Sequence, residues 1–457
     1  MNYYAFYAYS FLFGTSTAAY QIEGGWNADG KSENIWDHMT HSDPCATVDC
    51  SNGDVAGDSY HNYKRDVEMM RELGIDFYRF SISWSRILPT GFPDYINEAG
   101  AQHYNNFIDE MLKYNIEPMV TLYHWDLPQR LQDLGGWANP QIADWFADYA
   151  RIVFGLYGDR VKYWSTINEP KAVCYQGYGS DTKAPRLNVK GVAEYMCAKN
   201  LMLAHANAYH IYDQEFRPKY NGSIFISLSA QFYEPESDTD IEAADVSNEF
   251  EWAAWAHPIF SETGDFPKRF KEKIAAKSAE QGFFRSRLPE FTSEEVEYVR
   301  GTSDFFGLNH YSTYLVYRNE FEVGTVLNPT FKLFKDPVTK LHSPFIPQVV
   351  PWGFYKLLTK IRKDFNNPTV IITENGYSNH GGLDDDDRIS YQRRYQSAML
   401  DAIDEGSNII GYSVWSLMDN FEWMQGYTER FGLYEVDYES AESTRTPRKS
   451  AFVYKPN

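Results

Sequence analysis

Short apolar runs alternate with longer amphipathic stretches along nearly the whole chain. Each run is rich in β-branched and aromatic residues and is bounded by polar, Gly or Pro positions, a pattern typical of buried strands. Eight runs are therefore predicted as strands, at residues 11–20, 77–84, 118–124, 163–169, 223–232, 305–312, 369–375 and 409–415.

The stretches between these runs repeat apolar residues at spacings of three and four, which indicates helices that bury one face. Tyr104, Phe107, Ile108 and Met111, for example, form one apolar stripe. Helices are predicted over residues 60–73, 99–114, 142–157, 192–216, 353–365 and 389–405. Alternating strands and helices predict a parallel sheet, and about eight repeats close a (β/α)8 TIM barrel of the α/β class.

No Gly/Ser-rich or Pro-rich linker divides the chain. We therefore expect residues 1–457 to form a single (β/α)8-barrel domain, a size that such barrels often reach. Longer insertions occupy residues 24–57, 234–300 and 316–350. In a barrel, long loops after the strands usually build the rim of the active site.

The composition limits the classes of partner that the protein is expected to bind. With 43% hydrophobic and 23% charged residues, the chain has enough apolar material for a large core. Its net charge of −21 repels nucleic acids and anionic lipids unless a local basic patch overrides it. No uninterrupted apolar run reaches the roughly 18 residues of a membrane span. We expect neither a nucleic-acid nor a membrane partner, and the sequence leaves open whether the chain forms a homodimer.

Four cysteines are too few for a disulfide scaffold. Cys45 and Cys50 share a polar loop, where a bridge and two free thiols are both plausible. Cys174 and Cys197 are expected to be free, buried thiols. Because no Cys or His pattern suggests a metal site, we expect neither a metal nor another cofactor.

The compartment is not fixed by the sequence. Residues 1–10 show no signal peptide, which suits both a mature secreted chain and a cytoplasmic one, and we favour the secreted form. One N-glycosylation sequon, Asn221-Gly222-Ser223, is relevant only in a secretory compartment.

Polar residues at the ends of the predicted strands indicate the chemistry, because the C-terminal ends of barrel strands form the catalytic face. These residues are Gln21, Arg79, His124, Asn168, Glu169, Asn309, Tyr311, Glu374 and Trp415. The two glutamates belong to the fourth and seventh predicted strands. A glycosidase that retains anomeric configuration needs such a pair, roughly 5–5.5 Å apart.

Four motifs resemble those of glycoside hydrolase family 1, and the resemblance extends from about Phe11 to about Tyr454. Residues 11–25 read Phe-Leu-Phe-Gly-Thr-Ser-Thr-Ala-Ala-Tyr-Gln-Ile-Glu-Gly-Gly, like the family's N-terminal signature. Residues 166–170 read Thr-Ile-Asn-Glu-Pro and residues 371–376 read Ile-Ile-Thr-Glu-Asn-Gly. Residues 415–423 read Trp-Ser-Leu-Met-Asp-Asn-Phe-Glu-Trp, like the family's sugar-binding segment. Within the family the chain is most similar to insect β-glucosidases.

The resemblance implies roles for these residues. Glu169 is the acid/base, and Glu374 is the nucleophile, supported by Arg79 and Tyr311. The sugar-binding residues are Gln21, His124, Asn168, Asn309, Glu422, and the tryptophans Trp415 and Trp423. An alternative for Arg79 is a purely structural ion pair.

The resemblance also implies part of the substrate specificity, namely the type of sugar and one contact with the leaving group. Glu422 replaces the smaller polar residue of relatives that act on 6-phosphorylated sugars, so a neutral sugar is expected. Trp352 resembles the family's platform for the leaving group. Weaker candidates for that site are Ala172, Cys174, Lys183, Val246, Asn248 and Phe250. The sequence Asn309-His310-Tyr311 departs slightly from the commoner Asn-Tyr-Tyr.

These observations predict hydrolysis of the terminal β-glucosyl residue of small β-glucosides or oligosaccharides. One alternative is a thioglucosidase (myrosinase) acting on sulfated glucosinolates, although plant thioglucosidases carry Gln in place of Glu169. A catalytically weak sugar-binding relative is a second alternative, and net transglycosylation is a third.

Overall fold

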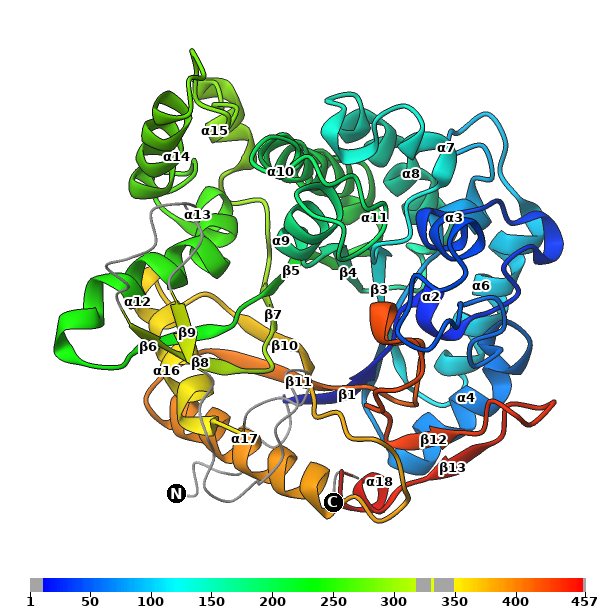
Figure 1. Ribbon diagram of the computed structural model, residues 1–457. Coiled ribbons are helices and arrows are strands. Elements are labelled where there is room, and N and C mark those ends of the chain that lie inside the picture. Colours follow the sequence, from blue (N-terminus) through cyan, green and yellow to red (C-terminus); the bar gives the residue numbers. More distant parts are fainter. Residues whose placement is uncertain (1–10, 318–329, 333–348, 455–457) are drawn as a thin grey trace.

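The computed structural model describes residues 11–317, 330–332 and 349–454 (Figure 1). Eight parallel strands close into a central barrel, in the order β1-β11-β10-β7-β5-β4-β3-β2. Their bounds are β1 (Leu12–Ser16), β2 (Phe77–Ser81), β3 (Glu117–Tyr123), β4 (Tyr163–Asn168), β5 (Ser223–Ser229), β7 (Phe306–Asn309), β10 (Val370–Asn375) and β11 (Ile409–Trp415). The predicted (β/α)8 TIM barrel is confirmed.

Several predicted strands were too long. Residues 11–20 contain β1 and then the start of helix α2 (Ala19–Ile22), and residues 223–232 run from β5 into β6 (Phe232–Pro235). Strand β6 leaves the barrel and forms a separate three-stranded sheet with β8 (Thr313–Tyr317) and β9 (Thr330–Lys332). The apolar runs continue past the strand ends because the first loop residues are buried as well.

All six predicted helices are present. They are α4 (Ser59–Leu73), α6 (Glu98–Leu112), α8 (Ile142–Tyr157), α10 (Ala193–Ile211), α16 (Pro351–Asp364) and α17 (Asp386–Asp404), and they surround the barrel (Figure 1). The predicted helix at 192–216 ends in a π-helix, Tyr212–Phe216. Within the described residues, no helix is both long and apolar enough to cross a bilayer.

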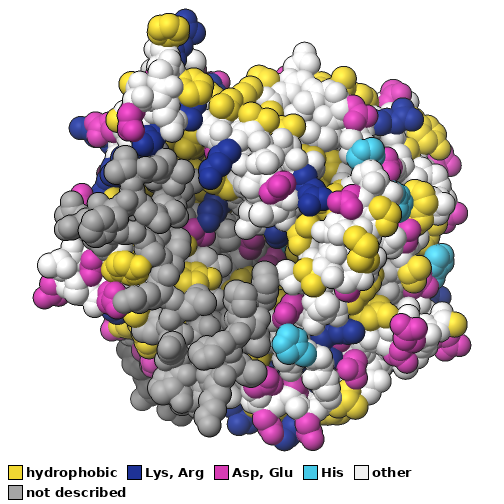
Figure 2. Space-filling view, viewed as in Figure 1, with side chains coloured by type: hydrophobic (Ala, Val, Ile, Leu, Met, Phe, Trp, Pro, Cys, Tyr) yellow, Lys and Arg dark blue, Asp and Glu magenta, His cyan; other side chains and the backbone are white. Residues whose placement is uncertain are grey.

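Shorter elements build the rim and the edges. They are α3 (Ile35–Ser42), α5 (Trp84–Ile87), α7 (Gln129–Gln132), α9 (Pro170–Ala172), α11 (Arg217–Tyr220), α12 (Ile241–Asn248), α13 (Ala254–Phe260), α14 (Lys268–Glu280), α15 (Ser293–Val299), α18 (Lys449–Tyr454), β12 (Tyr434–Val436) and β13 (Arg445–Pro447). Helices α12 to α15 occupy the predicted 234–300 insertion, and the segment between α14 and α15 projects from the surface (Figure 2). Most of the predicted 316–350 insertion lies outside the described residues.

Side chains alternate between the inside and the outside of the barrel. Phe77, Met119, Phe225 and Ile371, from four different strands, pack together as an apolar layer inside it. Arg79 lies two residues after Phe77 and therefore on the same face of β2, because strand side chains repeat with a period of two. This periodicity places a fully buried arginine above the apolar layer.

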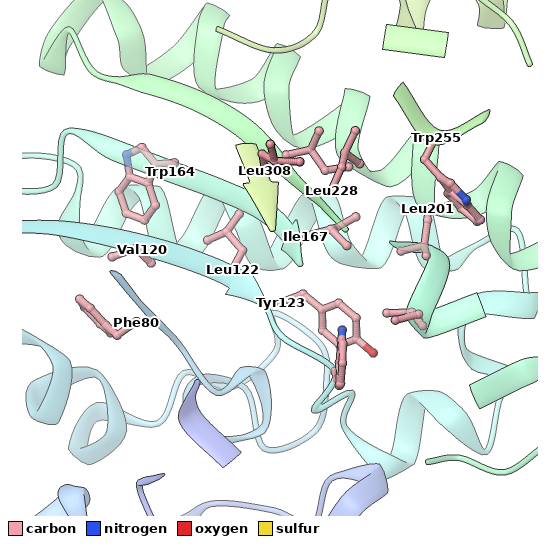
Figure 3. Packing of buried hydrophobic residues seen from close by; sticks show 14 of the residues in the cluster. Phe80, Val120, Leu122, Tyr123, Trp164, Ile167, Leu201, Leu228, Trp255 and Leu308 are labelled. Atoms are coloured by element: carbon pink, nitrogen blue, oxygen red, sulfur yellow. The ribbon is translucent and has the colours of Figure 1, made fainter. Parts of the chain in front are cut away.

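The opposite faces of the strands pack against the helices. Figure 3 shows this core, where Leu228 of β5 lies beside Leu308 of β7 and Trp164 projects from β4. Leu201 of α10 and Trp255 of α13 belong to the same cluster. This packing fixes the strand ends that carry the polar residues.

Two disulfides are formed, so one of our predictions was wrong. Cys45 is bonded to Cys50, which resolves the pair that the sequence left open. Cys174 and Cys197 were expected to be free but are also bonded to each other. The π-helix Val173–Tyr178 packs against α10, which brings the two Cα atoms to 5.4 Å, within the range of a disulfide.

Candidate active site

Glu374, near the end of β10, has a carboxylate that accepts two hydrogen bonds. Arg79 Nη1 donates to Glu374 Oε1 at 2.6 Å, and the Tyr311 hydroxyl donates to Oε2 at 2.8 Å. Arg79 is completely buried and Glu374 almost so. Both oxygens are therefore oriented by donors, which fixes the carboxylate in one position.

Glu169 follows β4 directly and has a different environment. Its Oε1 accepts a hydrogen bond from Asn309 Nδ2 at 2.9 Å. Burial, and next the negative charge of Glu374, raise the pKa of the Glu169 carboxyl to about 7. Asn309 bonds Glu169 and Tyr311, two residues later, bonds Glu374, so the two carboxyls face the same space.

Three of the residues around this space have a strained backbone. Glu169, Trp125 and Trp423 have φ values of +49°, +79° and +53°, in the left-handed region that non-glycine residues rarely adopt. Such conformations persist where the surrounding structure enforces them, and they cluster at functional sites.

Asn168 connects the arginine, the histidine and the Glu169 partner. Its Oδ1 accepts from Arg79 Nη2 at 2.7 Å and from Asn309 Nδ2 at 3.0 Å. Its Nδ2 donates to His124 Nε2 at 3.0 Å, so that nitrogen of His124 is the acceptor and Nδ1 carries the proton. Burial lowers the pKa of His124 well below its usual range, which keeps the ring neutral.

Gln21 and Glu422 lie together, although about 400 residues of sequence separate them. Gln21 Nε2 donates to Asn420 Oδ1 at 2.8 Å and lies 3.4 Å from Glu422 Oε2. Burial raises the pKa of Glu422, and the Lys183 ammonium opposes this shift. Among the described residues, Gln21 Oε1 and His124 Nδ1 have no hydrogen-bond partner, so each can bind a further hydroxyl group.

Aromatic rings line the space beside these polar groups. His124 stacks near both Trp415 and Trp423, with centroid separations of 5.8 and 6.0 Å. The Lys183 ammonium lies 3.6 Å from the centroid of the Trp125 ring and 5.6 Å from that of Trp423. Burial lowers the pKa of Lys183 to about 8, while the charges of Glu169 and Glu422 oppose that shift.

The leaving-group candidates are brought together less clearly. Trp352 is partly exposed at the start of α16, on the face where the strands end. Asn248 is buried and bonds the backbone of Tyr233, and Phe250 is buried against Phe270. Ala172 and Val246 also pack in or against the hydrophobic core, so the structure does not show either of them in the site. Cys174 is buried in its disulfide and offers no free thiol.

His310 explains the unusual Asn309-His310-Tyr311 motif. Its neighbours Asn309 and Tyr311 point into the site, whereas His310 points the other way, stacking on Phe354 and bonding Ala230 O. The substitution is therefore accommodated in the core. Trp125 was not predicted as a site residue, although its position directly after His124 was a usable signal.

Comparison with known proteins adds independent information. Residues 3–456 match the model of glycosyl hydrolase family 1. "Myrosinase 1" of Brevicoryne brassicae is 47% identical over 97% of both chains. "Cytosolic beta-glucosidase" of Homo sapiens is 43% identical over 97% of this chain and 96% of the relative. The solved structure "Aphid myrosinase" superimposes with a TM-score of 0.94 at 46% identity, covering 97% of each chain.

Proposed function

Because the chain belongs to glycosyl hydrolase family 1, we propose that it is a retaining β-glucosidase with Glu374 as nucleophile and Glu169 as acid/base. The substrates are small β-glucosides or oligosaccharides that carry a terminal, non-reducing β-glucosyl residue. One observation carries the proposal, namely that two carboxyls in one site have opposite environments. Glu374 is held by two donors, while Glu169 has a pKa of about 7 and is largely protonated below that pH.

The first step forms a covalent intermediate. Glu374 attacks the anomeric carbon, and Glu169 gives its proton to the departing glycosidic oxygen, so the leaving group departs as a neutral alcohol. In the second step Glu169 removes a proton from water, the water oxygen bonds to the anomeric carbon, and the bond to Glu374 breaks. Arg79 and Tyr311 then receive the restored carboxylate charge.

The glucosyl ring is bound by the remaining polar groups. Gln21 Oε1 and His124 Nδ1 supply one acceptor and one donor, and Asn168 and Glu422 supply further groups. The faces of Trp415 and Trp423 suit the C–H surface of a sugar. Glu422 offers no positive charge to a 6-phosphorylated sugar, and its ionised fraction repels the phosphate, because like charges repel.

The test is labelling with a 2-fluoro-β-glucoside, which slows the release of a glycosyl-enzyme. We expect a single sugar on the peptide that contains Glu374, and no labelling of Glu374→Gln or of enzyme protected by excess substrate. NMR should show the β-anomer as the first product. A label on another residue, or an α-anomer formed first, contradicts the proposal.

A thioglucosidase is the second candidate, because a myrosinase is 47% identical to this chain. A sulfated leaving group requires a positioned cation. Of the four basic residues between β4 and α10, Lys171 pairs with Glu251, Arg186 pairs with Asp43, and Lys190 is exposed. Lys183 alone lies against the aromatic wall of the site.

We also infer a secretory compartment. Disulfides persist in oxidising environments, and the described residues contain two of them. The sequon residue Asn221 is exposed before β5, at the end of the barrel opposite the site. Endoglycosidase treatment of the protein from its source tissue should reduce its mass, and an unchanged mass would count against this inference.

A further inference from the structure

An aromatic tip projects between α14 and α15, remote from the carboxyl pair in the sequence. We name residues 281–287 the tip (Figure 2). Phe284 is fully exposed and Phe283 is 44% exposed. An exposed pair of phenylalanines is costly in water, because each ring keeps its apolar surface hydrated.

Hydrogen bonds to Ser278 define the turn of the tip. The Phe283 amide donates to Ser278 O at 2.9 Å, and the amide and Nε of Arg287 both donate to Ser278 Oγ at 3.1 Å. Gly282 has φ +83°, and a Cβ there would meet no atom within 4 Å. Backbone hydrogen bonds and a glycine-specific conformation therefore hold the two rings outward.

The charge around the tip is opposite to that of the whole protein. Residues 268–287 contain seven Lys or Arg and two Glu, a net charge of +5, in a chain of −21. Because such a reversal is local, it creates a positive patch on an otherwise acidic molecule. A local patch of this kind attracts anionic surfaces, although the net charge of the whole protein repels them.

Several of these cations have no carboxylate partner. Lys268, Arg269, Lys271 and Lys277 form ion pairs. Lys273, Arg285 and Arg287 form none with any described residue, and Arg287 lies 4.6 Å from the ring of Phe283. Arg285, which is adjacent to Phe284 in the chain, and Arg287 therefore place unpaired positive charge beside the exposed rings.

The nearest acidic element does not neutralise the tip. Helix α15 carries Glu294, Glu295 and Glu297. Glu295 pairs with Lys199 and Glu297 pairs with Arg300. Glu294 of this helix and Glu290 before it have no ion pair among the described residues, so three unpaired cations outnumber two unpaired carboxylates and a small cationic excess persists.

We propose that the tip docks the protein on anionic lipid headgroups exposed in the compartment that it occupies, with Phe283 and Phe284 entering the interface and the exposed Lys273 and Arg285 facing lipid phosphates. Aromatic rings and basic side chains together are the combination that binds peripheral proteins to such surfaces. A nucleic acid or a second acidic copy of this chain would satisfy the cations but leave less apolar material for the rings. The negative charge of the rest of the protein does not prevent docking, because salt screens charges over about 8 Å at physiological ionic strength.

The test is co-sedimentation of the full-length protein with vesicles. Vesicles of phosphatidylcholine with 40% phosphatidylserine should bind at least about tenfold more protein than pure phosphatidylcholine, and 0.5 M NaCl should remove most of that difference. The variants Phe283→Ser/Phe284→Ser and Lys273→Glu/Arg285→Glu should each lose most of the binding. All variants should keep wild-type kcat/KM on an aryl β-glucoside, which separates this proposal from the catalytic one.

Matched controls replace an exposed ring and exposed cations elsewhere. Phe452→Ser removes a ring that is 72% exposed on α18, and Lys64→Glu/Arg130→Glu makes the same charge change away from the tip. Neither control should alter vesicle binding. The proposal is overturned by equal binding to the two vesicle types or by equal losses in tip and control variants. Tip-dependent binding to heparin or DNA without vesicle binding, or tip-dependent dimers by light scattering, would overturn it as well.

Discussion

Arg79 Nη1 and Glu374 Oε1 lie 2.6 Å apart in a site where the arginine is completely buried. The same guanidinium also donates to Thr121 Oγ1 and Asn168 Oδ1. Each of its three nitrogens therefore has an acceptor, so the guanidinium is fixed in one orientation. The position of the proposed nucleophile, Glu374, depends on this fixed cation.

Arg79→Met should lower kcat by about 10²–10³, equivalent to about 2.7–4 kcal/mol, because a preorganised donor to the reacting carboxylate is lost. Steady-state kinetics with an aryl β-glucoside measures the effect. Arg86→Met is the matched control, since Arg86 is equally buried and pairs with Glu23 at 3.1 Å. Both variants should be destabilised, but the folded control should retain its kcat, and equal losses of kcat would leave Arg79 with a structural role only.

Glu169→Gly should lower kcat/KM for substrates with poor leaving groups by about 10²–10⁴ and spare kcat/KM for those with good ones, because only the former need a proton in the first step. Alkyl and 2,4-dinitrophenyl β-glucosides make the comparison. With the 2,4-dinitrophenyl β-glucoside, kcat should fall because water attack on the glycosyl-enzyme has lost its base, and added azide should restore this turnover and give β-glucosyl azide, since a small anion fits where the carboxyl was. An equal loss on both substrates without azide rescue would remove Glu169 from the acid/base role.

Lys183→Met should move the basic limb of the kcat/KM profile to higher pH. The pKa of Glu169 is raised to about 7, and the charge of Lys183 opposes that increase. Without the ammonium, Glu169 keeps its proton to higher pH and the acid form survives longer. The difference should shrink above the Lys183 pKa of about 8, where the wild type also loses the charge. Lys171→Met is the control, because Lys171 pairs with Glu251, and an unchanged basic limb in Lys183→Met would contradict the coupling.

Much of this site was predictable from local sequence. Glu169 and Glu374 each follow an apolar run, and period-two alternation correctly places Asn309 and Tyr311 on one face and His310 on the other. Residues that end parallel strands meet at one end of a barrel, so their proximity follows from the fold alone.

Other features depend on tertiary packing and have no local signal. The bridge from Cys174 to Cys197 requires a π-helix to lie against α10, and the spacing of 23 residues does not encode that contact. The position of Lys183 over Trp125 likewise depends on two loops from different strands. The ends of β5 and β7 were missed because buried loop residues continue the apolar pattern.

The Cys174–Cys197 disulfide should contribute more stability than Cys45–Cys50. It closes the longer loop, with sequence separations of 23 against 5, and loop-closure entropy assigns about 3 and about 2 kcal/mol to them. Cys174→Ser/Cys197→Ser should therefore lower the Tm more than Cys45→Ser/Cys50→Ser in non-reducing thermal melts. If the order of the two losses is reversed, the longer bridge does not stabilise the segment after the acid/base.

A neutral aryl β-glucoside should be hydrolysed with higher kcat/KM than the glucosinolate sinigrin. Binding the sulfate needs a positioned basic fork, and two of the four nearby basic residues, Lys171 and Arg186, already have carboxylate partners. Lys183 is a single ammonium, which cannot bind a sulfate through two parallel hydrogen bonds as a guanidinium does, so it is a weak substitute for a fork. The measurement compares both substrates at pH 6, where Glu169 is protonated, and at low salt. If sinigrin won by about tenfold, equal to about 1.4 kcal/mol in transition-state binding, the chain would be a thioglucosidase. Lys183→Met should then erase that advantage while Lys171→Met leaves it intact, which would identify the residue responsible.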